Sequence, residues 1–193
     1  MSNFSDRLHN VIPGGAHTYS RGDDQYPKTA PQILSKGKGC RVWDPDGRSW
    51  LDYGMGLRSV TLGYADERVN EAAVRAIYQG NNLSRASYTE LEAAEAFTGL
   101  FDGKCMVKFA KNGSTVTTAA VKLARAFTGR DKIAVCAGQP FYSYDDWFIG
   151  QTCISRGIPV SERKITTTFN FNDIDSVKKC FSENPNSIAA IIL

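Results

Sequence analysis

The sequence has few of the residues that build metal centres and disulfide frameworks. It contains only two histidines, too few for a histidine-built metal site. Its five cysteines are odd in number and widely spaced, and no Cys-x-x-Cys pair occurs. Cys105 and Cys136 lie within apolar runs. We therefore expect reduced, buried thiols, as is usual in the cytosol, and no bound metal.

Charged blocks, a leader segment and a membrane span are also missing. The 23 basic and 20 acidic residues are spread along the chain, so no nucleic-acid or membrane-surface partner is predicted. Residues 1–7 lack the apolar segment of a signal peptide. The longest apolar run, residues 188–193, is far shorter than a membrane span. These absences predict a cytoplasmic protein, and the net charge of +3 suits a small anionic ligand.

The chain ends inside that apolar run. A domain rarely stops on Ile-Ala-Ala-Ile-Ile-Leu, because a bare apolar strand end needs cover. We therefore expect these 193 residues to be the front part of a longer protein.

The first half of the chain predicts separate helices and one hairpin. Apolar residues at helical spacing predict helices over residues 4–12, 66–80 and 89–100, the last with Leu91, Ala94 and Phe97 facing inward. Asp44-Pro45-Asp46-Gly47 has the composition of a type I turn and predicts a hairpin. Residues 16–32 and 54–63 are expected to be an irregular arm and a glycine-spaced loop.

The second half alternates strands with helices. The predicted strands cover residues 105–110, 132–137 and 187–193, and the predicted helices cover residues 114–127 and 173–182. The first of these helices has an apolar stripe made of Val116, Ala119, Ala120, Leu123, Ala124 and Phe127. Short apolar strands that alternate with helices predict a parallel α/β sheet.

One junction in this half has the makings of an anion site. Asn112-Gly113-Ser114-Thr115 joins a predicted strand to a helix. A helix start carries unpaired N–H groups and about half a positive charge, and glycine lets a ligand come close to the backbone. The hydroxyl groups of Ser114 and Thr115 add further donors. Taken alone, the same residues also fit an ordinary turn with a helix cap.

The order of motifs along the chain resembles the class III aminotransferases, and within them the glutamate-1-semialdehyde aminomutase group. The matching segments are Ile12–Gly15, Val42–Gly47, Leu51–Tyr53, Leu62–Tyr64, Asn112–Thr115, Leu123–Arg130 and Ile188–Leu193. This resemblance implies fold type I of the pyridoxal-phosphate (PLP) enzymes, with an arm and hairpin over residues 1–62, the start of the large α/β domain over residues 63–193, and a homodimer.

The resemblance also implies a cofactor site and a substrate site. Asn112, Gly113, Ser114 and Thr115 would hold the PLP phosphate, although the family has Ser-Gly-Thr where this chain has Gly113-Ser114-Thr115. Phe141 falls where the family stacks an aromatic ring on PLP, and an ordinary core aromatic is the alternative.

Three further residues are substrate candidates. Arg21 aligns with the arginine that holds the substrate carboxylate in the aminomutase, which suits bidentate pairing, and a solvated arginine is its alternative. Arg58 replaces part of an aromatic active-site loop and is a second candidate for an anionic group. Tyr142 stands where the family has histidine and implies a different substrate pocket.

The residues that drive the reaction are not among these 193. In the family, the lysine that bonds PLP and the aspartate on its pyridine nitrogen lie beyond residue 193. We therefore expect the complete protein to move an amino group to or within a small aldehyde or ketone, with residues 140–150 suggesting surface-polysaccharide biosynthesis, and this chain alone to be inactive. A non-catalytic short form that binds a phosphate-bearing ligand or a partner chain is the alternative, while no nucleotide-binding glycine motif occurs.

Overall fold

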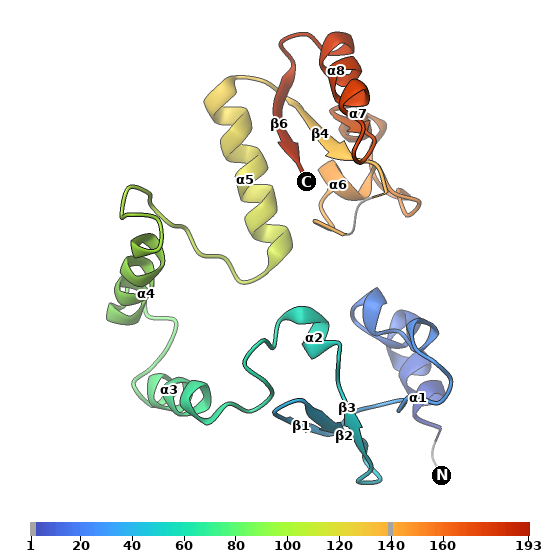
Figure 1. The fold of residues 1–193 in the computed structure, drawn as a ribbon, viewed down its shortest axis with the longest axis vertical. Coiled ribbons are helices and arrows are strands. Elements are labelled where there is room, and N and C mark those ends of the chain that lie inside the picture. The colour runs from blue at the N-terminus through green and yellow to red at the C-terminus, as the bar shows by residue number, and fades with distance from the viewer. Residues whose placement is uncertain (1–2, 139–140) are drawn as a thin grey trace. The chain divides into compact units, whose positions relative to one another are not determined.

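The computed structural model describes residues 3–138 and 141–193, which fall into two units, Met1–Ser87 and Tyr88–Leu193. Figure 1 follows the chain through both. The predicted boundary between residues 62 and 63 lies inside the first unit and stays a prediction.

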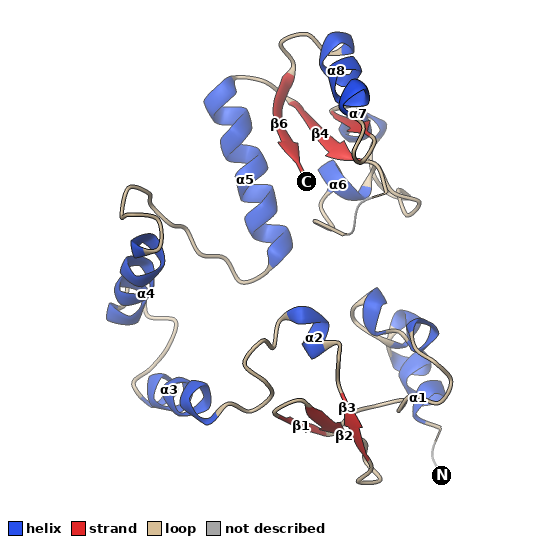
Figure 2. Ribbon diagram, in the orientation of Figure 1, coloured by secondary structure: helices blue, strands red, loops and turns tan. Residues whose placement is uncertain are grey.

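The first unit contains short helical segments and a small antiparallel sheet (Figure 2). Its elements are α1 (Phe4–Val11), η1 (Pro13–Gly15), η2 (Tyr19–Arg21), η3 (Asp23–Gln25), β1 (Lys36–Lys38), β2 (Arg41–Trp43), β3 (Ser49–Leu51), α2 (Met55–Arg58) and α3 (Glu67–Tyr78). The strand order is β1-β2-β3, with both pairs antiparallel.

The predicted hairpin is confirmed. The N–H group of Gly47 donates to the carbonyl of Asp44 at 3.1 Å and closes the turn between β2 and β3. Asp44 is buried, and its carboxylate accepts the N–H group of Arg48 at 2.9 Å and the indole N–H of Trp50 at 3.3 Å. The side chain of Asp44, the first residue of the turn, thus stabilises the turn by accepting hydrogen bonds from nearby donors.

The second unit contains a parallel sheet with helices on both faces. Its elements are α4 (Tyr88–Gly99), α5 (Gly113–Thr128), β4 (Lys132–Cys136), α6 (Asp146–Ile149), α7 (Val160–Lys164), β5 (Thr166–Phe169), α8 (Ile174–Glu183) and β6 (Ile188–Ile192). The strand order is β5-β4-β6, and β4 pairs in parallel with both neighbours. This confirms the predicted parallel α/β sheet.

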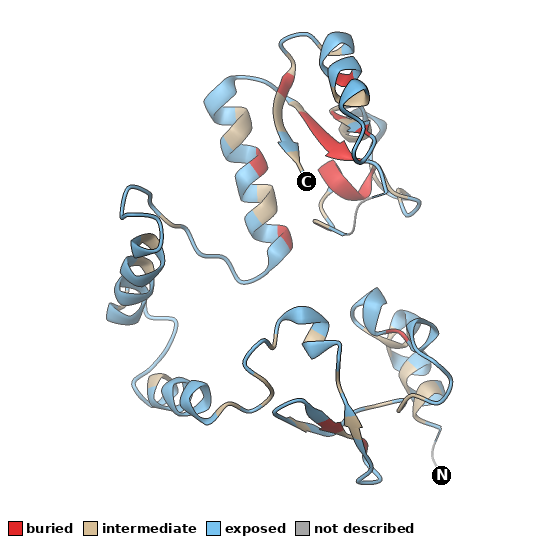
Figure 3. Ribbon diagram, in the orientation of Figure 1, coloured by how far each residue is buried: buried red, intermediate tan, exposed pale blue. Residues whose placement is uncertain are grey.

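The core of the second unit follows from the alternation of side chains along β4. Ile133 and Val135 pack with Val121 of α5 and with Trp147 and Phe148 of α6. The other face is a separate cluster made of Ala134, Cys136, Phe169, Cys180 and Ile188. Since β4 is covered on both faces, its sequence is apolar from Ile133 to Cys136, as expected for a central parallel strand. Figure 3 shows the buried residues of this unit gathered there.

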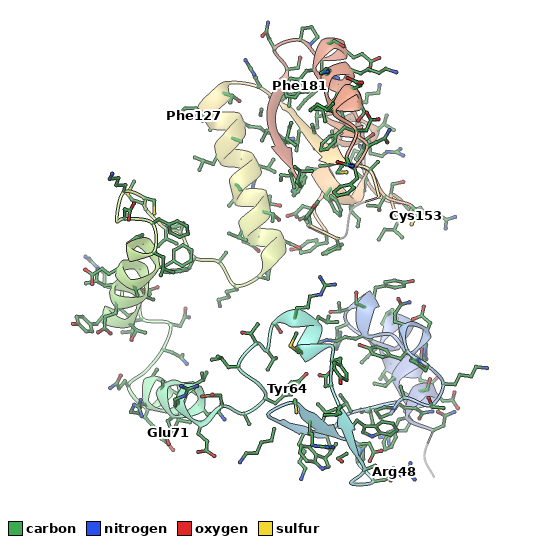
Figure 4. The ribbon with its side chains drawn as sticks, in the orientation of Figure 1. Arg48, Tyr64, Glu71, Phe127, Cys153 and Phe181 are labelled. Carbon is green, nitrogen blue, oxygen red and sulfur yellow. The ribbon has the colours of Figure 1, made fainter. Side chains whose placement is uncertain are left out.

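Helix α5 buries a different face from the apolar stripe that its sequence shows. Ser114 and Val121 are buried, whereas Leu123 is exposed and Phe127, labelled in Figure 4, is 88% exposed. The buried face includes Thr117 and Thr118, whose hydroxyls have hydrogen-bond partners in the loop after β4. The pattern of apolar residues did not predict this face because it is partly polar.

The inward orientation predicted for α4 is wrong in part. Leu91 and Phe97 are exposed, and neither α3 nor α4 has a buried residue. Both helices form where predicted, and Asp66 caps α3 by accepting the N–H groups of Arg68 and Val69. Within the described residues, neither helix is packed closely by another helix or strand of its own unit.

The predicted strand over residues 105–110 is absent. This segment lies outside every strand of the described chain, and Met106 is 98% exposed. A strand needs a hydrogen-bonded neighbour, and none of the described strands pairs with this segment. Conversely, β5 was not predicted, because Thr166-Thr167-Thr168 lacks an apolar run, although β-branched residues favour strands.

The cysteines are free, as predicted, but only two of them are buried. Cys136 and Cys180 lie in the core, whereas Cys40, Cys105 and Cys153 are exposed. Over residues 3–138 and 141–193, no group of side chains could hold a metal ion, and none of the helices there has the length and apolar character to cross a membrane.

Candidate functional site

The start of α5 is built as a capped helix end. Asn112 has extended backbone angles, and its side-chain oxygen accepts the N–H group of Thr115 at 2.9 Å and the hydroxyl of Thr115 at 3.0 Å. The cap therefore uses one N–H group of the first turn. The predicted helix cap exists, so an anion site here would have to share the helix end with Asn112.

Two further N–H groups at this end remain available. Gly113 and Ser114 occupy the first two helical positions, where no carbonyl of the helix can reach, and neither N–H group donates a hydrogen bond within the described chain. A Cβ atom added to Gly113 would meet nothing within 4 Å, and this glycine does not have a left-handed backbone. Glycine here thus leaves open space in front of unpaired donors, which fits a phosphate group.

The two hydroxyl groups of the cradle, defined as Asn112–Thr115, are placed differently. Ser114 is buried, and its oxygen accepts the N–H group of Tyr144 at 3.3 Å, which leaves its own hydrogen free to be donated. The hydroxyl of Thr115 donates to Asn112 and is therefore already used. Of the two predicted hydroxyl donors, Ser114 is the one that could serve a ligand without breaking an existing bond.

The loop after β4, which contains two more predicted residues, is bonded to α5 near the cradle. The hydroxyl of Thr117 donates to the carbonyl of Tyr142 at 3.1 Å. Phe141 is 62% exposed, and its ring meets Phe148 edge to face at a centroid distance of 6.0 Å. Pro140, the first residue of the segment that suggests surface-polysaccharide biosynthesis, lies outside the described residues, as does Gln139. The exposed ring of Phe141 and the start of α5 thus belong to the same unit, and the loop that carries Phe141 is bonded to α5.

The two predicted arginines belong to the first unit. Arg21 is exposed at the end of η2, and Arg58 is exposed at the end of α2. The structure therefore joins the cradle to the loop after β4 through Ser114 and Tyr144, with Tyr142 beside Thr117 of the same helix and Phe141 next to it in sequence, and describes Arg21 and Arg58 in a separate unit.

Arg58 lies in a left-handed turn where the sequence predicts a loop. Met55, Gly56, Leu57 and Arg58 have φ values of 47°, 57°, 59° and 70°. The N–H group of Arg58 donates to the carbonyl of Gly54 at 2.9 Å. A left-handed residue other than glycine costs about 1–2 kcal/mol, and strain of this kind gathers at functional sites. The sequence signal was weak, since only Gly56 favours such a conformation.

A tyrosine–aspartate pair holds the start of this turn. The hydroxyl of Tyr64 donates to the Asp52 carboxylate at 2.5 Å, and the same carboxylate accepts the N–H group of Gly54 at 2.8 Å. The hydrogen bond from Tyr64 lowers the pKa of Asp52, and the hydrogen bond to Asp52 raises the pKa of Tyr64. Both residues line a cavity of about 520 Å³ in the first unit, together with Leu51, Tyr53, Met55 and Leu62.

We predict that Tyr64→Phe lowers the free energy of unfolding by about 1 kcal/mol at neutral pH, since this hydrogen bond to a charged group is partly screened by solvent. Because the pKa of Asp52 is lowered in the folded state, its contribution is present above the usual value of 3.8 and lost as the pH falls through the lowered pKa. The contribution of Tyr64 is present below its usual value of 10.0 and lost as the pH rises through the raised pKa.

Urea unfolding of wild type and variant at several pH values measures this difference. The matched control is Tyr53→Phe, since Tyr53 is 89% exposed and adjoins the same carboxylate in sequence. Equal stability of wild type and Tyr64→Phe at neutral pH, or a difference that persists in strong acid, would contradict the assignment.

Comparison with known proteins identifies the chain's relatives. The family described as aminotransferase class-III matches residues 22–192. Glutamate-1-semialdehyde 2,1-aminomutase of Acetivibrio thermocellus is 32% identical over 97% of this chain and 46% of that protein. Aminopentol aminotransferase of Sphingopyxis macrogoltabida is 31% identical over 99% of this chain and 44% of that protein.

Solved structures give the same picture. The PLP internal aldimine form of the FumI protein of Sphingopyxis sp. MTA144 has a TM-score of 0.86 and 31% identity, covering 98% of this chain and 44% of that chain. An omega-transaminase of Sphaerobacter thermophilus also has a TM-score of 0.86, with 25% identity over 98% of this chain and 45% of that chain. The chain thus has the fold type I architecture and spans less than half the length of the curated relatives it matches.

Proposed function

Because this chain belongs to the class-III aminotransferase family, whose cofactor is PLP, we propose that the complete protein transfers an amino group to or within a small aldehyde or ketone. The observation that carries the proposal is the start of α5. There, unpaired N–H groups and the open space at Gly113 adjoin the loop that bears the exposed Phe141. Surface-polysaccharide biosynthesis is the setting we propose, together with the family's homodimer and a cytoplasmic location.

The residues of this chain would bind the cofactor and orient it. The N–H groups of Gly113 and Ser114 would hold the phosphate, and the hydroxyl of Ser114 would add a donor. Phe141 would cover one face of the pyridine ring, since stacking needs a ring and no hydroxyl. PLP, when bound, supplies a ring that accepts the electron pair of a bond broken at the amino-bearing carbon.

Two cationic residues would select the substrate. We propose that Arg21 binds a substrate carboxylate through its planar fork of N–H donors. Arg58 would bind a second anionic group, with the left-handed turn setting its direction. Tyr142 would border the substrate, where the family's histidine is replaced.

The lysine that bonds PLP and the aspartate on its ring nitrogen are proposed to lie beyond residue 193. Lys111 adjoins the cradle, but at that position it could at most pair with the phosphate. The 193-residue chain by itself is therefore proposed to bind PLP without transferring amino groups.

Reduction with borohydride in the presence of PLP tests this function. We predict that the complete protein acquires one PLP group on one lysine, and that peptide mapping places this lysine outside residues 1–193. The 193-residue chain, treated in parallel as the control, should show no lysine modified in stoichiometric amount.

Each alternative has its own outcome. A stoichiometric adduct on one lysine of the 193-residue chain would overturn the proposed location of the lysine. A complete protein that binds PLP and acquires no adduct would favour a non-catalytic module for a phosphate-bearing ligand. A complete protein that binds no PLP would overturn the proposed function itself.

A further inference from the structure

The loop that carries Phe141 is held to α5 by its backbone as well as by its side chains. The hydroxyl of Thr117 lies 3.1 Å from the carbonyl of Tyr142 and 2.9 Å from the carbonyl of Gly113, between which its one hydrogen is shared, and the N–H group of Tyr144 donates to the oxygen of Ser114 at 3.3 Å. These two bonds join residues that lie 25 and 30 positions apart in sequence. The loop is thus tied to the same helical turn that forms the cradle.

A second set of bonds lies one residue further along both segments. The hydroxyl of Thr118 donates to the carboxylate of Asp145 and accepts the indole N–H of Trp147 at 2.8 Å. The hydroxyl of Ser143 donates to the same carboxylate at 3.2 Å and accepts the N–H group of Asp145 at 3.0 Å. We call Thr118, Ser143, Asp145 and Trp147 the clamp.

The clamp is half-buried at Thr118 and Asp145 and buried at Ser143 and Trp147, which makes its bonds depend on one another. Ser143 has no exposed surface, and Trp147 is buried beside it. A buried indole that loses its partner cannot turn to water, so removing the hydroxyl of Thr118 leaves the indole of Trp147 unpaired and leaves the carboxylate of Asp145 with Ser143 as its remaining partner in the clamp. All hydrogen bonds of the clamp are therefore made in this arrangement of the loop, and a shifted loop would lose some of them.

The ring of Phe141 is not fixed by its own packing. It is largely exposed and touches Phe148 only edge to face. The residues that follow it, Tyr142 to Asp145, therefore contribute to setting its position. Those residues are the ones bonded to α5.

Resting on the proposed function, we propose that Thr118 and Asp145 are positioning residues, which hold the Phe141 ring and the Tyr142 side chain at a fixed place relative to the phosphate cradle. In this proposal the clamp acts through the loop and not by touching a ligand. It couples the group that would cover the cofactor ring to the group that would hold its phosphate, through a single helical turn.

The test compares Thr118→Val with Thr118→Ser in the complete protein. Valine has nearly the shape of threonine and no hydroxyl, whereas serine keeps the hydroxyl. The first measurement needs no cofactor: in the apoprotein, the amide hydrogens of Tyr144 and Asp145 should exchange about tenfold faster or more in Thr118→Val and near the wild-type rate in Thr118→Ser.

The second measurement is the circular dichroism of bound PLP in its visible absorption band, which responds to the orientation of neighbouring aromatic rings. It should change in sign or lose most of its intensity in Thr118→Val and be restored in Thr118→Ser. If Thr118→Val fails to fold, Asp145→Asn, which keeps the size and loses the charge, is expected to change both signals in the same direction.

The outcomes separate the clamp from the proposed function. Unchanged exchange in Thr118→Val and Asp145→Asn would overturn the clamp. Faster exchange with an unchanged dichroism band would overturn its role in placing the ring. A wild-type protein without a PLP band would overturn the proposed function and with it the placement over a cofactor, while the exchange measurement would still decide whether the clamp holds the loop.

Discussion

Replacing Asn112 with aspartate is expected to weaken PLP binding to the complete protein by about 30-fold while leaving α5 at least as stable as before. Aspartate can accept the same bond from the N–H group of Thr115, and its charge favours a helix start. The same charge would lie beside the phosphate. Two unit charges 4 Å apart repel by about 4 kcal/mol near a protein surface, and about half of that gives the stated factor.

The matched control is Asn112→Ser, a neutral cap of similar quality. Serine should leave the PLP dissociation constant within a few fold of wild type, as measured by absorbance titration, with thermal unfolding recorded in parallel. Equal PLP affinity of the aspartate and serine variants would mean that the phosphate does not bind at this helix start. The comparison separates loss of the cap from the added charge, because both variants retain a cap.

Arg21→Ala is expected to lower kcat/KM for a carboxylate-bearing amino donor by about 100-fold, with PLP still bound. A bidentate bond between a guanidinium and a carboxylate accounts for a loss of this size, and the PLP phosphate is proposed to lie at other residues. For an amine of similar size without a carboxylate, the same variant should behave nearly as wild type.

Two comparisons sharpen this result. Arg21→Lys keeps the charge and loses the planar fork, so it should recover only part of the activity. Arg58→Ala tests the second cationic position, which ends the left-handed turn. An equal loss with the carboxylate donor and the neutral amine would remove Arg21 from the substrate site, and an unchanged kcat/KM would do the same.

Helix starts were predictable because their signals are local. Asp66, Asn112 and Asp173 each precede a helix and accept an N–H group from its first turn. Such a cap depends on residues two or three positions away, and these are visible in the sequence. The same holds for the hairpin at Asp44, whose bonds close within a few residues.

Features that depend on distant partners were not predictable. The apolar segment at residues 105–110 reads as a strand, but a strand exists only where another strand pairs with it. Thr118 and Asp145 are 27 positions apart, so nothing in either neighbourhood marks them as partners. The cradle could therefore be placed from its motif, while the clamp that ties the aromatic loop to it could not.

The left-handed turn at Met55–Arg58 was missed for a different reason. Propensities assign a left-handed backbone to glycine, and Gly56 is the only glycine among these residues. Asp52 and Tyr64 supply the bonds that hold its beginning, and they are ordinary residues in sequence. Backbone strain that is held by contacts with other residues is therefore hard to predict from the amino-acid composition of the strained segment.

The central place of β4 in the order β5-β4-β6 has a consequence for synthesis on the ribosome. β4 ends at Cys136, but its second neighbour is complete only at Ile192. At about 5–20 residues per second, the nascent strand waits several seconds with an edge unpaired. During that interval Ile133 and Val135 have only part of their final cover. Chaperones that bind short apolar segments should therefore meet β4 before the sheet closes around it.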